Sequence, residues 1–233
     1  MDGAAADRPA AELGAGPQAP RLVVCGTDTD VGKTLVSAWL VQGLGATYWK
    51  PVQCGLEGGG DREQVQRWLG LPAERLLPEA YRYRAPASPH WAAELESGDP
   101  EHPGQPLDPE RLALPAVAGP LVVETAGGLL VPLRLDLLQI DQVQRWGLPV
   151  LLVARSGLGT LNHTLLSVEA LRHRGIPLLG LVLNGPFHAN NTATLEQLTG
   201  APVLACLPPL AAINSDTLAQ QWQEQELAHK LNP

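Results

Sequence analysis

The chain has 233 residues, of which 45% are hydrophobic and 17% charged, enough apolar material for one sizeable globular domain. Its 16 lysines and arginines against 24 aspartates and glutamates give a formal net charge of -8, which argues against a basic surface for nucleic acid or anionic lipid. The three cysteines form neither a disulfide framework nor a paired metal site, and no apolar run reaches the ~20 residues that cross a bilayer. We therefore expect a cytoplasmic protein with small-molecule partners, no nucleic acid and no membrane.

Residues 1–20 are rich in alanine, glycine and proline, so we expect a disordered leader followed by a single domain over residues 21–233. In that domain, short apolar runs alternate with longer helical patterns. Continuous hydrophobicity is typical of strands that are covered on both faces, as in a parallel sheet between layers of helices. The runs are RLVVCG (21–26), ATYWKPV (46–52), PLVVETA (120–126), PVLLVA (149–154), LLGLVLN (178–184) and PVLACLP (202–208).

Helical patterns cover residues 33–43, 61–70, 160–175, 190–200 and 216–229, and several end at or near a glycine, a frequent C-terminal signal. The stretch 71–115 is dense in proline and polar residues, which predicts irregular loops with short helices. The predicted fold is therefore α/β, with three layers in which a mostly parallel sheet is flanked by helices.

The segment GTDTDVGKT (26–34) joins the first predicted strand to the first predicted helix, the context of a phosphate-binding loop. Its backbone amides and the following helix dipole favour phosphate oxygens. Lys33 is predicted to contact the β- and γ-phosphates of ATP, and the Thr34 hydroxyl to bind Mg²⁺. Five residues separate Gly26 from Gly32, one more than the strict pattern, so the fold is P-loop NTPase-like with a variant loop. The loop alone does not specify a reaction, because this fold serves kinases, ligases, switches and motors.

This loop resembles the GTDTxVGKT loop of dethiobiotin synthetases, including the extra residue. YWKPVQCG (48–55), APASPHWAAE (85–94), VETAGG (123–128), GLGTLNHT (157–164) and LVLNG (181–185) are similar to further motifs of that family, in the same order. The resemblance spans about residues 21–210. It implies an ATP- and Mg²⁺-dependent homodimeric ligase of biotin biosynthesis. Such an enzyme carboxylates 7,8-diaminononanoate with CO2, activates the carbamate with ATP and closes the ring of dethiobiotin, releasing ADP and phosphate.

Three residues carry most of the expected chemistry. Lys50 follows the second predicted strand at the carboxyl edge of the sheet, where open α/β folds bind ligands, and the resemblance makes it catalytic together with Lys33. Glu124 lies in a buried apolar strand, a costly place for a carboxylate without a cation, which predicts a Mg²⁺ ligand alongside Thr34. Asp61 resembles a third metal-side residue, but an aspartate before a helix is also an ordinary N-cap, and both interpretations stay open.

The nucleotide site extends to other parts of the chain. Asn184 ends its strand with an amide able to read the edge of adenine, and the resemblance assigns it that task, with a simple turn asparagine as the alternative. The resemblance implies a full set of ATP-binding residues: Asp30, Val31, Gly32, Lys33, Thr34, Leu35, Asp61, Glu124, Thr125, Ala126, Gly127, Asn184, Gly185, Leu207, Pro208 and Pro209.

The resemblance places a second set of residues at the diamine substrate. A helix is predicted to begin at residues 159–162, so its amides can hold a carboxylate across a two-fold dimer interface, although helix capping alone would also explain this sequence. Cys54 replaces a serine of the family, and thiols donate weaker hydrogen bonds, so we expect a different affinity for the diamine. Thr125 replaces a glycine beside Glu124, which we expect to alter the local nucleotide contact. The substrate-binding set is Thr29, Cys54, Gly159, Thr160, Leu161 and Asn162.

Two other protein classes share this kind of loop. A partitioning or septum-positioning ATPase normally has a second lysine early in the loop, where this chain has Thr27, and the segment LAQQWQEQELAHKLNP is not a strongly basic membrane helix. Amidotransferase-type cobyrinate ligases usually carry a glutaminase domain, for which we expect no room in 233 residues. The prediction is therefore dethiobiotin synthase activity.

Overall fold

The computed structural model describes residues 19–101 and 103–231, so most of the expected leader lies outside the described residues. Its centre is a seven-stranded sheet in the order β11-β10-β9-β1-β6-β2-β4, and every neighbouring pair in it is parallel. The predicted α/β fold is confirmed. The strands are β1 (Arg21–Gly26), β2 (Thr47–Trp49), β4 (Leu76–Leu77), β6 (Leu121–Gly128), β9 (Val150–Arg155), β10 (Leu178–Asn184) and β11 (Val203–Leu207).

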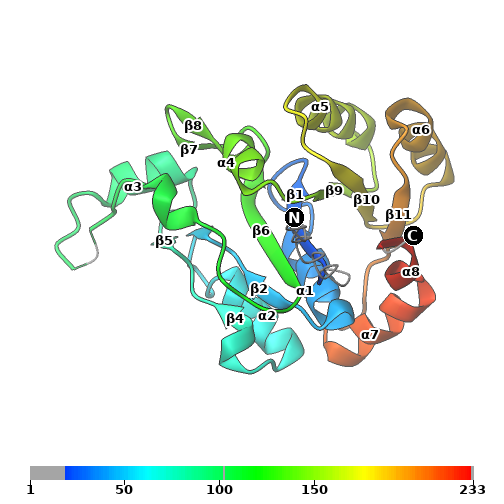
Figure 1. Cartoon of the computed structure of the whole chain (residues 1–233), viewed down its shortest axis with the longest axis horizontal. Coiled ribbons are helices and arrows are strands. Elements are labelled where there is room, and N and C mark those ends of the chain that lie inside the picture. Colours follow the sequence, from blue (N-terminus) through cyan, green and yellow to red (C-terminus); the bar gives the residue numbers. More distant parts are fainter. Residues whose placement is uncertain (1–18, 102, 232–233) are drawn as a thin grey trace, which may run out of the picture.

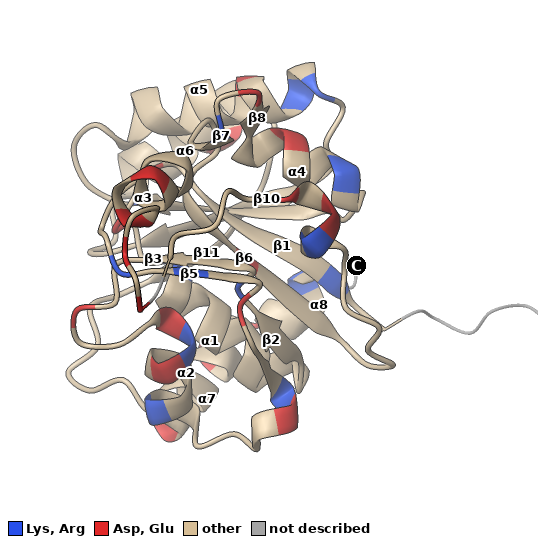
Figure 2. Ribbon diagram, turned by 90° about the vertical axis from the view of Figure 1, so that its left-hand side faces the viewer, with Lys and Arg blue, Asp and Glu red and all other residues tan. Residues whose placement is uncertain are grey.

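Helices cover both faces of the sheet (Figures 1 and 2). One face packs against α1 (Lys33–Leu44), α2 (Asp61–Leu69), α7 (Ser215–Glu224) and α8 (Leu227–Leu231). The other packs against α4 (Gln139–Trp146), α5 (Thr160–His173) and α6 (Ala189–Thr199). The three predicted layers are therefore present, with charged residues mainly on helices and loops (Figure 2).

Alternation along the strands divides the core into two apolar clusters. In β1, Leu22 and Val24 face the α1 side, whereas Val23 and Cys25 face the α4 and α5 side. All four side chains are buried, which explains why the sequence shows a continuous apolar run instead of an alternating one. Burying each such side chain contributes roughly 1.5–3 kcal/mol before the entropy of ordering is subtracted.

The stretch predicted as irregular contains more regular structure than expected. β3 (Val52–Cys54) and β5 (Tyr81–Tyr83) form a small parallel sheet, and two 3-10 helices span Ala73–Arg75 and Pro109–Leu112. Helix α3 (Pro89–Glu96) and the loop after it extend away from the main sheet (Figure 1). β7 (Pro132–Arg134) and β8 (Leu137–Leu138) form an antiparallel hairpin beyond β6. Helix α3 joins the same apolar cluster as α4, α5 and α6 through β3, β5 and β7.

Two predicted elements are interrupted. The run 46–52 is not one strand, because β2 ends at Trp49 and β3 begins at Val52, with Pro51 lacking an amide donor between them. The helix predicted over 216–229 divides into α7 and α8, with Glu226 between them at a φ of 51°. The sequence also did not predict α4 or the hairpin.

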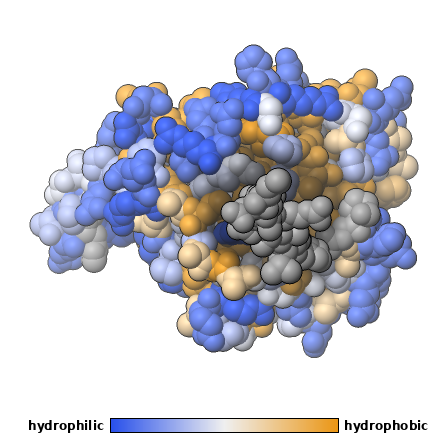
Figure 3. Space-filling view, viewed as in Figure 1, coloured by the Kyte–Doolittle hydropathy of each residue, from blue (hydrophilic) through white to orange (hydrophobic). Residues whose placement is uncertain are grey.

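On the face shown in Figure 3, hydrophilic residues occupy the outer rim and apolar residues gather toward the middle.

Within residues 19–101 and 103–231, none of the helices has the length and apolar character that a membrane span requires.

Candidate active site

The phosphate loop lies between β1 and α1, at the carboxyl edge of the sheet. In the sheet, β6 and β9 lie on opposite sides of β1, so the connections beside the loop lead away in opposite directions. Ligands usually bind at such a point in open α/β sheets. Gly32 caps α1 with a φ of 97°, a conformation that side chains other than glycine rarely adopt. Asp30 also has a positive φ, of 56°. The loop is therefore folded around an open helix N-terminus.

The Lys33 side chain turns back across the loop. Its Nζ donates to the backbone oxygen of Asp28 at 2.8 Å. Burial lowers the pKa of Lys33, an effect that nearby Glu124 opposes and nearby Lys50 increases. The Asp28 carboxylate is also engaged, since it accepts a hydrogen bond from the Thr29 amide at 2.8 Å and lies 3.0 Å from the guanidinium of Arg155.

Glu124 is the centre of the buried polar cluster. Its side chain has no exposed surface, and three donors from different elements reach it. Oε1 accepts from Thr34 Oγ1 at 2.9 Å and from Lys50 Nζ at 3.1 Å, while Oε2 accepts from the Tyr48 hydroxyl at 2.9 Å. Buried carboxylates require such partners, because an unpaired one costs several kcal/mol.

Strand register brings these groups together. In β6, Val123 pairs with Trp49 of β2, so the next residues along both strands, Glu124 and Lys50, lie side by side. Lys50 also bonds to the carboxylate of Asp61. Burial disfavours the Lys50 ammonium, but the negative charges of Glu124 and Asp61 outweigh that effect and raise the pKa of Lys50 above its usual value. The lysine therefore stays charged at physiological pH.

The two interpretations of Asp61 are separated by the geometry. The N-cap of α2 is Gly60, and Asp61 is the first helical residue, with its carboxylate directed at Lys50. The helix start is held by Glu63, which accepts from the Gly60 amide at 3.0 Å, and by Gln53, whose Oε1 accepts from the Asp61 amide at 3.1 Å. The N-cap interpretation of Asp61 is therefore wrong.

Thr34 and Glu124 fit a magnesium ion. Mg²⁺ takes oxygen ligands and binds through one or two carboxylates together with substrate phosphates, instead of in an all-protein cage. Asp61 offers a second carboxylate on the far side of Lys50. Among the described residues, no cluster of three or more His, Cys, Asp or Glu side chains could hold an ion by itself. The donor set accordingly suits an ion that arrives with a nucleotide.

A cavity of about 760 Å³ opens onto this cluster. The predicted residues that line it come from the phosphate loop, from residues 50–61 and from the end of β6. They are Thr29, Asp30, Gly32, Lys33, Thr34, Lys50, Cys54, Asp61, Ala126 and Gly127. The sequence did not predict the remaining wall, which is formed by Gln53, Gly55, Glu57, Gly59, Pro86, Ala87, Ser88, Pro89 and Val131. Four of these, residues 86–89, belong to the segment 85–94 that carried part of the family resemblance, which was the available signal.

Other predicted ATP-binding residues lie beside the loop, outside this cavity lining. The Asn184 amide donates to the Val31 backbone oxygen at 3.1 Å, so it contacts the phosphate loop directly. Gly185 follows it, and its amide donates to the Leu207 oxygen of the neighbouring strand at 2.9 Å. Leu35 is partly buried at the start of α1. The contacts of these residues with the adenine base stay predictions.

Three residues that were predicted to contact the nucleotide, Thr125, Pro208 and Pro209, have different surroundings. Thr125 is buried, and its hydroxyl donates to the Val24 oxygen at 3.2 Å, so its branched side chain fits between β6 and β1. Pro208 lines a separate hollow of about 480 Å³ beside β11, and Pro209 is exposed next to it. Their contacts with ATP stay predictions.

Residues 159–162 are not among the residues that line the main cavity. Gly159 is the N-cap of α5, and Thr160 is buried with its hydroxyl 3.3 Å from that of Thr164. Asn162 is exposed, and the nearby Leu158 is 102% exposed. In a single chain, this helix start and the cavity are separate features.

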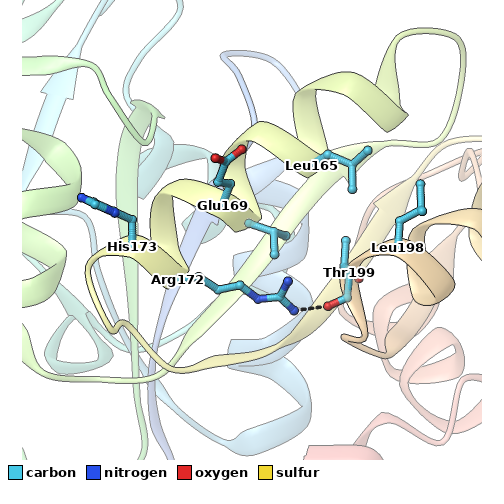
Figure 4. A pocket seen from close by; sticks show the side chains of 7 residues that line it. Leu165, Glu169, Arg172, His173, Leu198 and Thr199 are labelled. Carbon is cyan, nitrogen blue, oxygen red and sulfur yellow. Dashed lines mark hydrogen bonds between the residues drawn. The ribbon is translucent and has the colours of Figure 1, made fainter.

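A second cavity, of about 550 Å³, lies between α5 and α6 (Figure 4). Arg172 crosses it and donates to the Thr199 backbone oxygen. Glu169 and His173 also line it, with apolar side chains from both helices. None of the predicted site residues belongs to this cavity.

The chain matches the family described as AAA domain over residues 20–217. It is 51% identical over 199 residues to an ATP-dependent dethiobiotin synthetase of Rhodopseudomonas palustris strain BisA53, covering 85% of this chain and 90% of that protein. A protein of the same name from strain BisB5 is 53% identical over 84% of this chain and 90% of its own length. Another, from Novosphingobium aromaticivorans, is 49% identical over 87% of this chain and 94% of its own length.

Solved structures share the fold at much lower identity. The septum site-determining protein MinD of Pyrococcus horikoshii, complexed with Mg-ADP, superposes with a TM-score of 0.53 at 16% identity, covering 92% of this chain and 94% of that one. A plasmid partition protein of Borrelia burgdorferi bound to AMPPNP gives a TM-score of 0.51 at 10% identity, covering 92% and 99%. These likenesses show a P-loop NTPase fold.

Proposed function

The chain belongs to the ATP-dependent dethiobiotin synthetases, and from this premise we propose that it closes the ureido ring of dethiobiotin from 7,8-diaminononanoate, CO2 and ATP. The enzyme class is a ligase that forms carbon–nitrogen bonds in biotin biosynthesis. One observation carries the assignment of its site. Thr34 and Lys50 donate hydrogen bonds to the buried carboxylate of Glu124, and Lys50 also bonds to Asp61, next to the phosphate loop.

The proposed reaction proceeds through two activated species. One amine of the substrate adds to CO2 and loses a proton, which gives a carbamate. A carbamate oxygen attacks the γ-phosphorus of ATP and ADP leaves, which gives a mixed carbamic–phosphoric anhydride. The second amine then attacks the carbonyl carbon, phosphate leaves and the ring closes. No protein nucleophile is needed, so positioning and charge stabilisation carry the catalysis.

Two lysines that line the cavity supply positive charge. Lys33 lies on the phosphate loop, where its ammonium can follow the β- and γ-phosphates. Lys50 lines the cavity and is kept charged by its carboxylate neighbours, so it can stabilise the carbamate and the transferred phosphoryl group. Magnesium, held by Thr34 and Glu124 with Asp61 nearby, would neutralise phosphate charge when bound with ATP.

The substrate carboxylate is proposed to bind at residues 159–162 of a second copy in a homodimer. Within one chain this helix start is not part of the cavity, yet its backbone amides suit an anion. Leu158 and Leu166 are exposed along the same segment, at 102% and 58%, and a second copy would cover them. Both features support a site that is shared between two subunits.

The experiment that tests the function follows ATP turnover and dethiobiotin by mass spectrometry, with Mg²⁺ and bicarbonate, in the presence and absence of 7,8-diaminononanoate. We expect product that depends on the diamine. Lys50→Met should abolish product formation, because it keeps the aliphatic stem and removes the charge facing Glu124 and Asp61.

Lys230→Met is the matched control, since Lys230 bonds to the Leu204 backbone oxygen and is not among the residues that line the main cavity. Circular dichroism checks folding, because an unpaired buried carboxylate can cost about 3–5 kcal/mol. ATP hydrolysis that ignores the diamine, with no dethiobiotin formed, would favour a nucleotide switch and reject the synthetase proposal.

A further inference from the structure

The Tyr48 hydroxyl contacts the oxygen of Glu124 that the other two donors leave free. Thr34 and Lys50 both bond to Oε1, whereas Tyr48 is the one described residue that bonds to Oε2, at 2.9 Å. The Tyr48 side chain has no exposed surface, and neither has that of Glu124. This carboxylate is therefore held at both oxygens, with each oxygen assigned to different partners.

Alternation in β2 explains why a tyrosine reaches this position. Tyr48 and Lys50 are two residues apart, so they point to the same face of the sheet, where α1 and Glu124 lie. Trp49 points to the opposite face, where its indole donates to the Pro78 oxygen at 3.2 Å. The ring of Tyr48 thus reaches along β6 toward Glu124, while Trp49 packs away from the cavity.

The hydroxyl donates to Oε2 from a fully buried position. Without this donor, Oε2 would be a charged, buried oxygen with no water to solvate it, and the carboxylate would gain by turning toward other donors.

We propose that Tyr48 is a positioning residue of the nucleotide–metal site: its hydroxyl fixes the rotation of the Glu124 carboxylate and so presents Oε1 beside the Thr34 hydroxyl. The inference rests on the proposed function only in that the proposed function says which reaction this site performs. The two oxygens that would hold the ion, Thr34 Oγ1 and Glu124 Oε1, are 2.9 Å apart, and the third donor bonds to the other oxygen of the carboxylate.

The test measures metal affinity directly, with Mn²⁺ as the probe, ADP present and no diamine. Electron paramagnetic resonance reports free Mn²⁺ during a titration of the protein. Tyr48→Phe, which removes only the hydroxyl, should weaken Mn²⁺ binding roughly 10-fold, the lower end of the effect of losing a group that orients a metal ligand.

Tyr81→Phe is the matched control. Its buried ring lies in β5, and its hydroxyl accepts from the Asp108 amide at 2.7 Å, outside the carboxylate cluster. This variant should leave Mn²⁺ affinity unchanged. Equal affinities for Tyr48→Phe and Tyr81→Phe would overturn the proposal.

A double-mutant cycle separates positioning from a general loss of packing. If Tyr48 acts through Glu124, then adding Tyr48→Phe to Glu124→Gln should have little further effect on Mn²⁺ affinity. A purely structural role would produce the same factor in both backgrounds, and that result would contradict the proposal.

A measurement without substitutions covers the case in which a variant fails to fold. The chain has three tyrosines, so incorporation of 3-fluorotyrosine gives three fluorine resonances that Tyr→Phe variants can assign. Addition of Mg²⁺ to the ADP complex should shift the Tyr48 resonance and leave those of Tyr81 and Tyr83 in place. An unmoved Tyr48 resonance would refute the proposal. Because these readouts need no diamine, failure to make dethiobiotin would reject the proposed function alone.

Discussion

At the scale of single residues, the thiol of Cys54 in the cavity wall is less reactive than its position near a lysine would suggest. Cys54 lines the cavity close to Lys50, and a cationic neighbour usually lowers a thiol pKa. Here burial is the larger influence, and it raises the pKa of Cys54 to about 12 even though Lys50 lowers it. The group is therefore a neutral thiol at physiological pH, which agrees with a mechanism that uses no protein nucleophile.

Cys54 should consequently be alkylated slowly in the native protein. Only the thiolate reacts, and a thiol with a pKa of about 12 begins to ionise appreciably only above pH 11. We expect iodoacetamide at pH 8 to label Cys54 at least ~10-fold more slowly than in the urea-unfolded chain, where the pKa is about 8.5. Peptide mass spectrometry separates Cys54 from Cys25 and Cys206. Equal native and unfolded rates would contradict the buried-thiol interpretation.

At the scale of elements, the phosphate loop is fitted closely against β10. A Cβ atom placed on Gly32 would lie 2.1 Å from Asn184 Nδ2, and the backbone there has a φ of 97°. Gly32→Ala should therefore displace the loop as well as strain it. We expect nucleotide affinity to fall about 10-fold or more, equivalent to at least ~1.4 kcal/mol, in a titration with a fluorescent ADP analogue.

Gly45→Ala provides the matched comparison, because Gly45 ends α1 with a φ of 63° and has nothing near the added carbon. It should cost about 1–3 kcal/mol of folding stability through backbone strain and leave nucleotide affinity unchanged. If both variants bound nucleotide equally well, contact between the loop and Asn184 would have no role in shaping the site.

The start of α2 is a second element on which the site depends. Gln53 is buried; its amide nitrogen donates to the oxygens of Cys54 and Gly55 at 3.0 and 3.2 Å, and its oxygen accepts from the Asp61 amide. One side chain therefore fixes a cavity wall and the first turn of α2 together. Asp61, in that first turn, bonds to Lys50.

Gln53→Leu should reduce stability and activity together. Leaving buried backbone groups unpaired costs roughly 1–3 kcal/mol, measured by urea unfolding. Displacement of Asp61 should also lower kcat for dethiobiotin about 10-fold. Gln42→Leu is the control, since Gln42 bonds to Ser215 at 3.0 Å between α1 and α7 and should affect stability alone. Unchanged kcat in Gln53→Leu would show that Asp61 is placed without Gln53.

At the scale of the whole molecule, the cavity and the start of α5 are separate within one chain, and the proposed dimer would join them. Lys50→Met should be inactive through loss of its cation. Asn162→Asp, at an exposed position, should bind the substrate carboxylate poorly because like charges repel.

Mixing these two inactive variants distinguishes a shared site from an internal one. If one subunit supplies Lys50 and its partner supplies Asn162, hybrid dimers contain one intact site and activity should return after subunit exchange. If each chain built its own site, every site would contain one of the two substitutions and mixing would restore nothing. Light scattering of the purified chain checks that the dimer exists.

The sequence by itself determined the fold class, the phosphate loop and the family. Continuous apolar runs and the segment 26–34 specify strands, a crossover helix and an anion site through local physics, which a linear pattern carries. Lys33 and Thr34 could be named from that loop and Glu124 from its buried strand, whereas the family resemblance made Lys50 catalytic.

Only the tertiary structure decided how those residues meet. Four features depend on contacts between distant segments: the break at Pro51, the register that places Glu124 beside Lys50, the pairing of Asp61 with Lys50 and the third donor to Glu124, from Tyr48. The cavity wall from residues 86–89 also comes from a stretch whose proline content predicted irregular loops with short helices. The physical reason is that hydrogen bonding and charge in a buried site are set by neighbours in space, and a one-dimensional pattern does not contain those distances.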